Sequence, residues 1–411
     1  MNVRILVVGA GIVGIACALE LQRRGAEVII VDRAPPAEGC SFGNAGIIAT
    51  SETFPLITPA RLKQLPSMLL RRDGPVVLRV GAAGRALPWF ARAALTLSAE
   101  RQASIAGALG ILNRRALPAW RALLGYAEAS HLLVERGMLE LVRDPRECSG
   151  LIERAKLLSE MGLAAHMLSG NEVRELEPTL GPASVGAILH EGTAHVTDPY
   201  RTAKLLMEAF RAGGGQLAED LVLRTRPTES GIEISGKIHR WNVDHCVVAT
   251  GLASAALLRP YRVRVPLLAE RGYHLMLPDA ASALSRPVTF HAESCVATPL
   301  SGGLRIAGTV EFAHEGAVPD WTRAERLKEF AGRYFRTPLS TCGSTRWLGS
   351  RPSLPDSLPA IGRLEAEPRI AYAFGHQHLG LTQAAATAEI IADMLAGQGG
   401  RNVSAYRIER F

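Results

Sequence analysis

The 411-residue sequence lacks the features that mark several classes of protein. Its six cysteines are scattered without C-x-x-C spacing, which predicts isolated thiols in a reducing compartment and neither a disulfide framework nor a zinc site. Aromatic residues are only 5% of the chain and do not interleave with its basic stretches, so nucleic acid is not an expected partner. No uncharged apolar run reaches the roughly 18 residues of a bilayer-spanning helix. We therefore expect a cytoplasmic protein.

Length and charge set further bounds. A hydrophobic content of 47% over this length can fill one large core or two medium ones, and we expect two interleaved domains. The 46 basic residues exceed the 39 acidic residues only mildly and are spread along the chain. Pairs such as Arg71-Arg72 and Arg114-Arg115 are therefore interpreted as solvated helix faces.

The first 32 residues have the pattern of a βαβ unit. Arg4–Val8 is a short β-branched run that stops at glycine, as a buried parallel strand does. Ile12–Arg24 alternates apolar and charged residues at helical spacing, and Gly25 ends it. A second apolar run, Glu27–Val31, closes at Asp32.

The turn between the first strand and the helix has the spacing of a dinucleotide fingerprint. It reads Gly9-Ala10-Gly11-Ile12-Val13-Gly14. Gly9 permits the tight turn, Gly11 lets a pyrophosphate approach the backbone, and Gly14 allows close helix-to-strand packing. Asp32 follows Gly14 by 18 residues, where a carboxylate accepts hydrogen bonds from ribose, and we place Arg33 beside it in the same site. The fingerprint alone does not separate FAD from NAD.

In the rest of the chain the sequence pattern changes twice, first to helical and then to strand-forming. Beyond about residue 55 the sequence predicts an inserted helical layer, and between about 260 and 345 it predicts antiparallel strands with one helix. Asp198 is expected to cap the helix that starts at Pro199, so neither it nor His195 is given a catalytic role. The other expected elements are strands at 216–226, 231–234, 243–249, 272–277, 303–310 and 369–374, and helices at 323–334 and 382–395.

Four further segments resemble those of the D-amino-acid oxidase superfamily, closest to its bacterial D-amino acid dehydrogenases. They are Cys40–Gly46, similar to S-x-x-N-(A/G)-G; Val247–Gly251, similar to the A-T-G strand; Trp347–Gly362, similar to G-x-R-P-x-x-P-D-x-x-P-x-I-G; and Gly375–Thr382, similar to the final glycine turn. The resemblance runs from Asn2 to Phe411. It implies a mixed α/β fold in which a Rossmann-type FAD-binding domain, residues 1–55, 190–258 and 345–411, is interleaved with an antiparallel-sheet-plus-helix substrate domain, residues 56–189 and 259–344.

The resemblance also implies a dissociable, non-covalent FAD and the residues around it. Beyond the fingerprint, these are Ser41, Asn44, Ala45, Gly46, Val222, Ala249, Thr250, Gly251, Gly349, Gly375, His376, Gly380, Leu381 and Thr382. A reduced flavin gains negative charge around N1 and O2, and the amides at the start of the last helix would stabilise that charge. For Thr382 a plain helix N-cap is the alternative.

Four residues are the candidates for contact with substrate or for lining its pocket. Arg351, the arginine of the R-P motif, is expected to grip a substrate carboxylate with its planar fork. The alternative is an arginine that is salt-bridged to Asp356 or packed for structure. Tyr273, in an R-G-Y segment, is expected to donate to the same carboxylate or line the pocket, and a structural tyrosine is the alternative. His376 and His378 are expected to line the pocket, with simple turn structure as the alternative; two histidines without a third ligand do not predict a metal.

These assignments predict FAD-dependent oxidative deamination of a small D-amino acid. With the amine neutral, hydride leaves Cα for the flavin, no general base is obligatory, and the imine hydrolyses to a 2-oxo acid. The open alternatives are a secondary amine such as D-proline, D-hydroxyproline or sarcosine, an FAD-bearing subunit of a larger dehydrogenase, and an NAD-dependent dehydrogenase.

The electron acceptor is expected to be a quinone or oxygen. A quinone would suit peripheral contact with the inner face of the cell membrane. The segments 56–70 and 87–97 are the candidates for that contact, with Arg61, Lys63, Arg71, Arg72 and Arg92 toward lipid phosphates. A helical cap over the active site is the alternative for this region and the interpretation that we favour.

Overall fold

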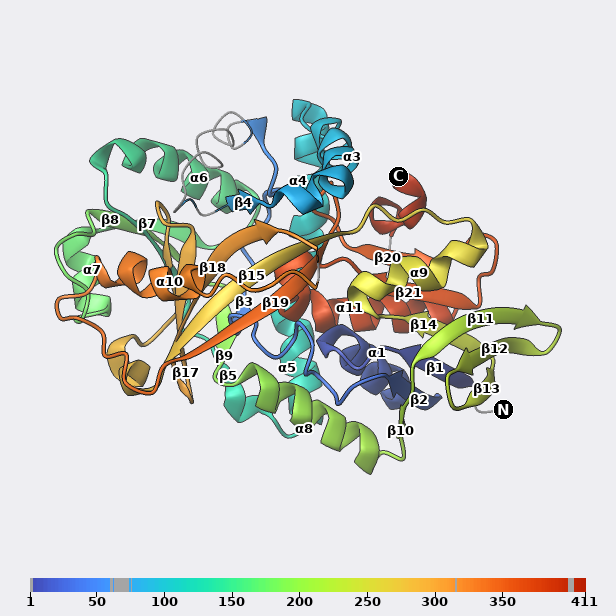
Figure 1. Ribbon diagram of the computed structural model, residues 1–411. Coiled ribbons are helices and arrows are strands. Elements are labelled where there is room, and N and C mark those ends of the chain that lie inside the picture. The colour runs from blue at the N-terminus through green and yellow to red at the C-terminus, as the bar shows by residue number, and fades with distance from the viewer. Residues whose placement is uncertain (1–2, 60–61, 63–73, 75, 315, 398–402) are drawn as a thin grey trace.

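The amino-terminal segment folds as the βαβ unit that its pattern predicts. The computed structural model describes residues 3–59, 62, 74, 76–314, 316–397 and 403–411 (Figure 1). Strand β1 (Arg4–Val8) runs parallel to β2 (Glu27–Asp32), and helix α1 (Ile12–Arg23) joins them. Four consecutive residues of each strand are buried, as expected where helices cover both faces of a parallel sheet.

A six-stranded sheet grows from this unit in the order β10-β2-β1-β14-β21-β20. All neighbours are parallel except β20, which is antiparallel to β21. The added strands are β10 (Gln216–Glu219), β14 (His245–Val248), β20 (Ala360–Arg363) and β21 (Ile370–Phe374). Helix α1 packs against α8 (Pro199–Ala212) and α11 (Gly380–Leu395). The side chain of Asp198 accepts from the amide of Arg201, which confirms it as the cap of α8.

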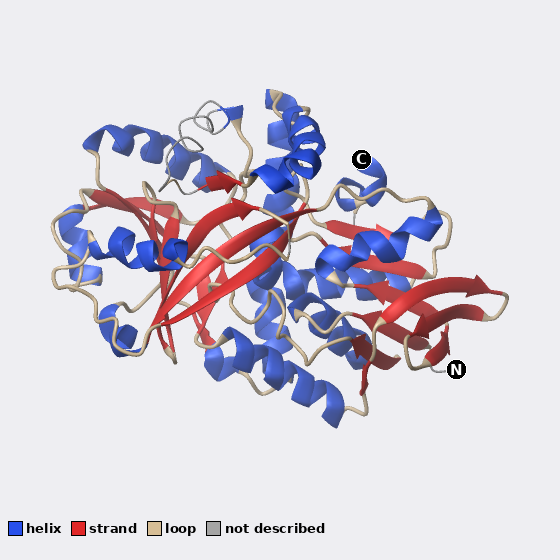
Figure 2. Cartoon of the chain, in the orientation of Figure 1, coloured by secondary structure: helices blue, strands red, loops and turns tan. Residues whose placement is uncertain are grey.

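A second, mostly antiparallel sheet forms the other lobe (Figures 1 and 2). Its order is β19-β15-β18-β17-β16-β6-β8-β7, with β4 beside β18. The strands are β4 (Val76–Leu78), β6 (Met138–Val142), β7 (Ala165–Ser169), β8 (Gly186–His190), β15 (Leu268–Leu277), β16 (Val288–Phe290), β17 (Cys295–Leu300), β18 (Gly303–Phe312) and β19 (Thr345–Ser353). Helix α10 (Thr322–Gly332) covers one face of β15 and β18.

The predicted helical layer and two small sheets complete the fold. The helices are α3 (Ala83–Ala94), α4 (Ala99–Arg114), α5 (Ala116–Tyr126), α6 (Cys148–Glu160), α7 (Gly170–Leu176) and α9 (Ser254–Leu258). The small sheets are β3 (Ile47–Ile48), β9 (Ala194–Val196) and β5 (Leu133–Val134), and β11 (Val222–Thr228), β12 (Gly231–Gly236) and β13 (Arg240–Val243). The indole nitrogen of Trp120 in α5 donates to the carbonyl of Leu381 at 2.8 Å, so the layer is fixed to the first turn of α11.

Two predicted strands are each divided between two sheets. The stretch 216–226 breaks at Asp220, whose buried carboxylate accepts from the amides of Lys237, Ile238 and His239 at 2.7–3.1 Å. The stretch 243–249 breaks at Asp244 between β13 and β14. In both cases an aspartate ends one strand, and the apolar pattern on either side is continuous enough to hide the break.

The strand β19 crosses the predicted domain boundary at residue 345. It lies in the range assigned to the FAD-binding domain, yet all nine of its residues pair with β15 in the large sheet. The other large-sheet strands fall within or at the edge of the predicted substrate-domain ranges. The domain division itself stays a prediction.

Replacing Gly14 with alanine tests the close packing of α1. A Cβ on Gly14 would lie 1.9 Å from the carbonyl oxygen of Gly9, so helix and strand must separate to admit it. We expect Gly14→Ala to lower the free energy of unfolding by about 1–3 kcal/mol, as overpacked cores do. Urea unfolding followed by circular dichroism measures it. The matched control is Gly107→Ala in α4, where nothing lies within 4 Å and a small gain is expected; equal effects at both positions would contradict the packing argument.

Candidate functional site

The carboxyl ends of β1, β2, β14 and β21 meet at one edge of the six-stranded sheet. Gly9 turns the chain there with φ +109°, a value that side chains rarely adopt, and its amide donates to Val31 at 2.8 Å. A Cβ on Gly9 would approach the carbonyl of Ala249 to 2.5 Å. The predicted residues Thr250 and Gly251 follow directly, and Val222 begins β11 next to the end of β10. The structure thus brings these predicted residues to one edge.

The start of α1 forms a cradle of backbone amides. Gly11 is the N-cap in an extended conformation and, as a glycine, supplies no side-chain cap of its own. The amide of Ile12 donates to Oγ of Ser41 at 2.9 Å, and a Cβ on Gly11 would lie 3.4 Å from the same oxygen. Backbone donors, the positive end of a helix dipole and the absence of bulk suit a diphosphate.

Asp32 has a structural task that sequence reasoning did not assign. Its Oδ2 accepts from the amide of Ala10 at 2.6 Å, and its Oδ1 accepts from the amide of Ala34 at 3.2 Å. The carboxylate therefore closes the glycine turn from the adjacent strand. It is half-buried, whereas Arg33 beside it is exposed.

A second loop, Cys40–Gly46, lies against this cradle and is held from two sides. Within the loop, Asn44 donates to the carbonyl of Ser41 at 2.6 Å and accepts from the amide of Gly46 at 2.8 Å. From the large sheet, Arg305 of β18 donates to the carbonyl of Asn44 at 2.6 Å, and Nδ1 of His274 in β15 lies 2.9 Å from the carbonyl of Gly43. Ala45 lies between the anchored carbonyls and Gly46.

Sequence reasoning missed Arg305 and His274. Burial lowers the pKa of Arg305 to about 10, with Asp198 acting in the opposite direction. Burial, and then the charge of Arg305, lower the pKa of His274 to about 3, so this ring is neutral near pH 7. Because the carbonyl of Gly43 can only accept, Nδ1 carries the proton and the lone pair lies on Nε2. Arg305 belongs to no recognisable motif. In the segment 271–274, the sequence analysis proposed a role for Tyr273 and none for His274.

The turn at Gly375 leads into α11. Gly375 has φ +78°, and Gln377 has φ +52° with its side chain donating to the carbonyl of Leu354 at 2.8 Å. His376 is buried beside Oγ1 of Thr387 at 3.0 Å, and burial lowers its pKa to about 3. That contact fits turn structure better than the predicted pocket lining. His378 is exposed.

Thr382 lies inside α11 and does not cap it. The helix begins at Gly380, so the N-cap alternative for Thr382 is wrong. Its hydroxyl accepts from the amide of Ala49 at 3.0 Å and donates to the carbonyl of Ile47 at 3.2 Å. The first turn of α11 is thereby fixed to β3, which follows the Cys40–Gly46 loop.

Arg351 points to the same side of the large sheet as the loop-binding histidine. In the antiparallel β15–β19 pair, Arg351 lies opposite Glu270, and Gly349 lies opposite Gly272. Residues that face each other share one side of a sheet, and so do alternate residues of one strand. The two pairs and His274 therefore lie on one face, which we call the front face. A Cβ on Gly272 would lie 2.3 Å from Nη2 of Arg351, so the guanidinium extends over this glycine.

Glu270, not Asp356, is the partner of Arg351. Nη1 of Arg351 donates to Oε1 of Glu270 at 2.9 Å, and the hydroxyl of Ser353 donates to Oε2 at 2.7 Å. Asp356 instead pairs with Arg410 at 2.5 Å, so the predicted alternative partner was wrong. Glu270 is 6% exposed at its side chain, whereas Arg351 is 22% exposed. The carboxylate of Glu270 is buried and accepts two hydrogen bonds. It therefore orients the guanidinium of Arg351, which still reaches solvent.

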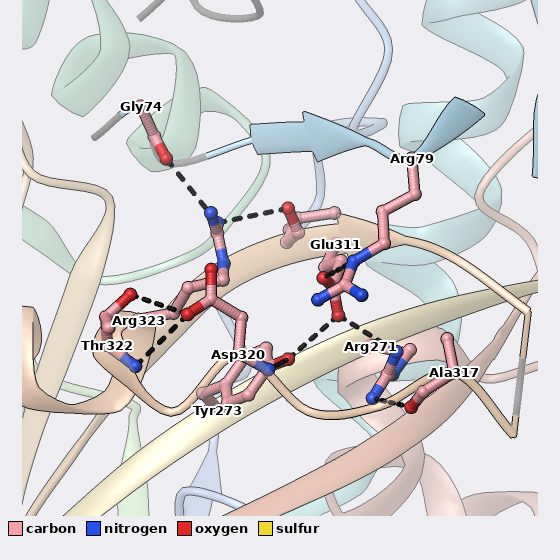
Figure 3. A network of polar contacts seen from close by, with 10 residues as sticks. Gly74, Arg79, Arg271, Tyr273, Glu311, Ala317, Asp320, Thr322 and Arg323 are labelled. Atoms are coloured by element: carbon pink, nitrogen blue, oxygen red, sulfur yellow. Dashed lines mark hydrogen bonds and ion pairs between the residues drawn. The ribbon is translucent and has the colours of Figure 1, made fainter. Parts of the chain in front are cut away.

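Tyr273 points to the opposite side, the back face, toward α10 (Figure 3). Its hydroxyl donates to Glu311 at 2.8 Å and accepts from the amide of Asp320 at 3.0 Å. Arg271, which is fully buried, and Arg79 both pair with Glu311. Burial raises the pKa of Tyr273. Since its one donor is used here and Arg351 is on the front face, the structural alternative fits Tyr273, and we leave it out of the candidate site.

Comparison with known proteins places this architecture in a family. The model of the family described as DAO, FAD dependent oxidoreductase, matches residues 4–394. The chain belongs to this family. A D-amino-acid oxidase of Bradyrhizobium diazoefficiens is 30% identical over 408 residues, covering 96% of this chain and 95% of that protein. A D-amino acid dehydrogenase of Dechloromonas aromatica is 30% identical over 411 residues, covering 96% and 97%.

Solved structures share the fold of this DAO-family protein. Glycine oxidase from Geobacillus kaustophilus superposes with a TM-score of 0.76 at 20% identity, covering the whole of both chains. L-Proline dehydrogenase from P. horikoshii gives a TM-score of 0.74 at 17% identity, covering 100% of this chain and 98% of that one. FAD is the cofactor of the family, so the NAD-dependent alternative is wrong. The amide cradle and the glycines that keep it open fit the diphosphate of this cofactor.

A titration of stability tests the neutral state of His274. Its pKa of about 3 in the fold is below the 6.5 of an unfolded histidine, so the unfolded chain binds the proton first as pH falls. Stability from this group is complete above pH 6.5 and is lost toward pH 3, with a slope of up to about 1.4 kcal/mol per pH unit. We expect His274→Gln to flatten the fall in unfolding free energy between pH 6 and pH 4. Gly107→Ala, which removes no titratable group, should shift the profile without changing its slope; an unchanged slope in His274→Gln would contradict the assignment.

Proposed function

We propose that the protein oxidises a small D-amino acid through its FAD, giving an imine that hydrolyses to a 2-oxo acid. The observation that carries this proposal is the guanidinium of Arg351, oriented by Glu270 on the front face that also anchors the Cys40–Gly46 loop. The full-length similarity to proteins named D-amino-acid oxidase and D-amino acid dehydrogenase supports the substrate class and its configuration.

Arg351 would hold the carboxylate of the substrate. Glu270 binds Nη1 and is itself fixed by Ser353, so the guanidinium plane is set before substrate arrives. A planar fork fixed in this way binds a carboxylate with two parallel, charge-assisted hydrogen bonds. Holding the carboxylate fixes the position of Cα relative to the sheet, which is how the chain would orient the C–H bond to be broken.

The remaining site residues would hold the cofactor. The amides of the glycine turn and Ser41 would surround its diphosphate, and Asp32 would add a ribose contact to its role in the turn. The first turn of α11, at Gly380 and Leu381, would stabilise negative charge placed against it. When bound, the flavin supplies the acceptor for the hydride from Cα.

Proton transfer does not require a charged histidine in this proposal. The amine loses its proton before reaction, and its lone pair forms the C=N bond as hydride departs. His274 and His376 have pKa values of about 3 and are neutral at physiological pH. His378, which is exposed at the turn before α11, is the remaining imidazole that we propose near the substrate.

Replacing Arg351 with lysine tests the carboxylate contact. Lysine keeps the charge but loses the bidentate fork, so we expect kcat/KM for D-alanine to fall by about 10–100-fold, equivalent to about 1.4–2.8 kcal/mol. Anaerobic reduction of the bound flavin, followed by its absorbance near 450 nm, measures it. The control is Arg346→Lys on the same strand, where the guanidinium pairs with Glu325 over the ring of Trp321. Equal losses in both variants, or none in either, would exclude the role given to Arg351.

The same assay separates the alternative substrates. The panel contains D- and L-amino acids together with D-proline, D-hydroxyproline and sarcosine. Faster reduction by a secondary amine would replace the primary amine in the proposal. Reduction by the isolated chain would argue against a subunit that needs partners for its chemistry.

We propose a quinone or oxygen as the electron acceptor and α3 as a contact with the membrane surface. The inner side of α3 packs Ala86, Trp89 and Ala93 against the large sheet, with the Trp89 indole donating to the carbonyl of Ser353 at 3.1 Å, which fits the helical cap. Its outer side presents Leu87 and Leu95, 64% and 71% exposed. Exposed leucines beside a basic residue, here the exposed Arg92, suit an anionic lipid surface.

In the part of the chain that the structure describes, no helix is long and apolar enough to cross a membrane. Most of the segment 56–70, and the basic residues Arg61, Lys63, Arg71 and Arg72, lie outside the described residues.

Vesicle sedimentation tests the contact through α3. We expect the double variant Leu87→Glu, Leu95→Glu to lose at least about tenfold in binding to vesicles of anionic lipid, because both changes bring charge to the apolar side. The control is Ile238→Glu, equally exposed at 72% in the hairpin between β12 and β13. Equal sedimentation of wild type and double variant would remove α3 from the proposal.

A further inference from the structure

Trp347 stands on the front face beside the proposed substrate arginine. It lies on the same side of β19 as Gly349 and Arg351, and it pairs with His274 of β15. The indole and the imidazole are stacked, with ring centroids 5.1 Å apart and planes inclined by 17°. Since His274 is also bonded to the carbonyl of Gly43, the stack is fixed to the Cys40–Gly46 loop.

Two glycines make room for this indole. A Cβ on Gly43 would lie 2.2 Å from ring carbons Cδ2 and Cε3 of Trp347, and a Cβ on Gly349 would lie 2.0 Å from Cη2. Any side chain at either position would therefore overlap the ring. The indole thus fills the space between the loop and strand β19, with its outer edge over Gly349.

The edge of the indole and the guanidinium approach the same pair of glycines from opposite ends. Gly349 faces Gly272, and Nη2 of Arg351 would lie 2.3 Å from a Cβ on Gly272. Facing Cβ positions in a sheet are about 4.5–5.5 Å apart, so the indole edge and the guanidinium are within about 10 Å of each other. A hydrogen-bonded carboxylate takes up roughly 3 Å of that distance. The room left along the sheet accommodates Cα and few further atoms.

We propose that Trp347 is the wall that limits the size of the substrate side chain. The stack on a neutral, hydrogen-bonded His274 keeps the ring in place, so a long or aromatic side chain would have to displace it. The substrate class is then amino acids with side chains of few heavy atoms. This inference rests on the proposed function, because it takes Arg351 as the anchor of the carboxylate.

The test compares substrate preference in Trp347→Ala and Trp347→Phe. Flavin reduction is measured anaerobically with D-alanine, D-leucine and D-phenylalanine, and kcat and KM are determined separately. Removal of the indole should raise kcat/KM for D-phenylalanine relative to D-alanine by at least about tenfold, because a pocket discriminates by about that much per methylene. Trp347→Phe should be intermediate. The gain should appear mainly in KM for the larger substrates.

Leu348→Ala is the matched control. Leu348 is the next residue of β19, but it pairs with Tyr273 and so faces the back of the sheet. Its truncation should leave the ratio of D-phenylalanine to D-alanine as in the wild type. If Leu348→Ala changes the ratio as much as Trp347→Ala does, the size-limiting role of Trp347 is rejected. General loosening of the strand would then explain both results.

Two other results overturn the inference in distinguishable ways. An unchanged ratio in Trp347→Ala, with Arg351→Lys still impaired, would reject the wall and retain the proposed function. Loss of bound flavin from both Trp347 variants, but not from Leu348→Ala, would assign the indole to the cofactor instead. If no amino acid reduces the wild-type flavin, the proposed function fails and the wall fails with it.

Discussion

The hydrogen bonds from Arg305 and His274 to two consecutive loop carbonyls fix the large sheet to the loop that follows the βαβ unit. The Cys40–Gly46 loop follows the βαβ unit that we propose to bind the nucleotide, while both donors lie on the large sheet. Neither contact depends on the side chain of a loop residue, since each ends on a backbone oxygen. Because both donors are buried, a donor left without its carbonyl would incur a desolvation cost of roughly 1–3 kcal/mol. The position of Arg351 relative to the cofactor cradle follows from this attachment.

Local sequence pattern was sufficient to predict the βαβ unit and insufficient to predict which side chains meet on the large sheet. The βαβ unit, its glycines and Asp32 lie within 32 residues, so their geometry follows from sequence spacing and turn chemistry. The pairing of Arg351 with Glu270 joins residues 81 apart, and spacing says nothing of it. The motif drew attention to Arg351, whose contact with substrate stays a prediction, and Asp356, five residues away, was wrong as its partner. Proximity in sequence was a weak guide once strands from different segments paired.

A β-bulge explains why the side of the sheet was hard to infer. Along β18 the register with β15 shifts between Arg271 and Tyr273, and Thr309 has φ +57° at that place. The extra residue reverses the alternation, so Arg305 faces the front and Glu311 faces the back although both positions are odd-numbered. Strict alternation along β18 would place Arg305 and Glu311 on the same side of the sheet. The back-face network around Glu311 and the front-face anchor at Asn44 therefore depend on one irregular residue.

Strand β15 assigns its even-numbered side chains to the front and its odd-numbered side chains to the packed back. Glu270, Gly272 and His274 belong to the first set, and Arg271, Tyr273 and Leu275 to the second. A deletion or insertion of one residue here would exchange the two sets, so that an arginine or a tyrosine would project where Gly272 now leaves room. We therefore expect evolutionary change in this region to be confined to replacements at fixed length. Variation in length should accumulate instead in the connections at either end of the strand.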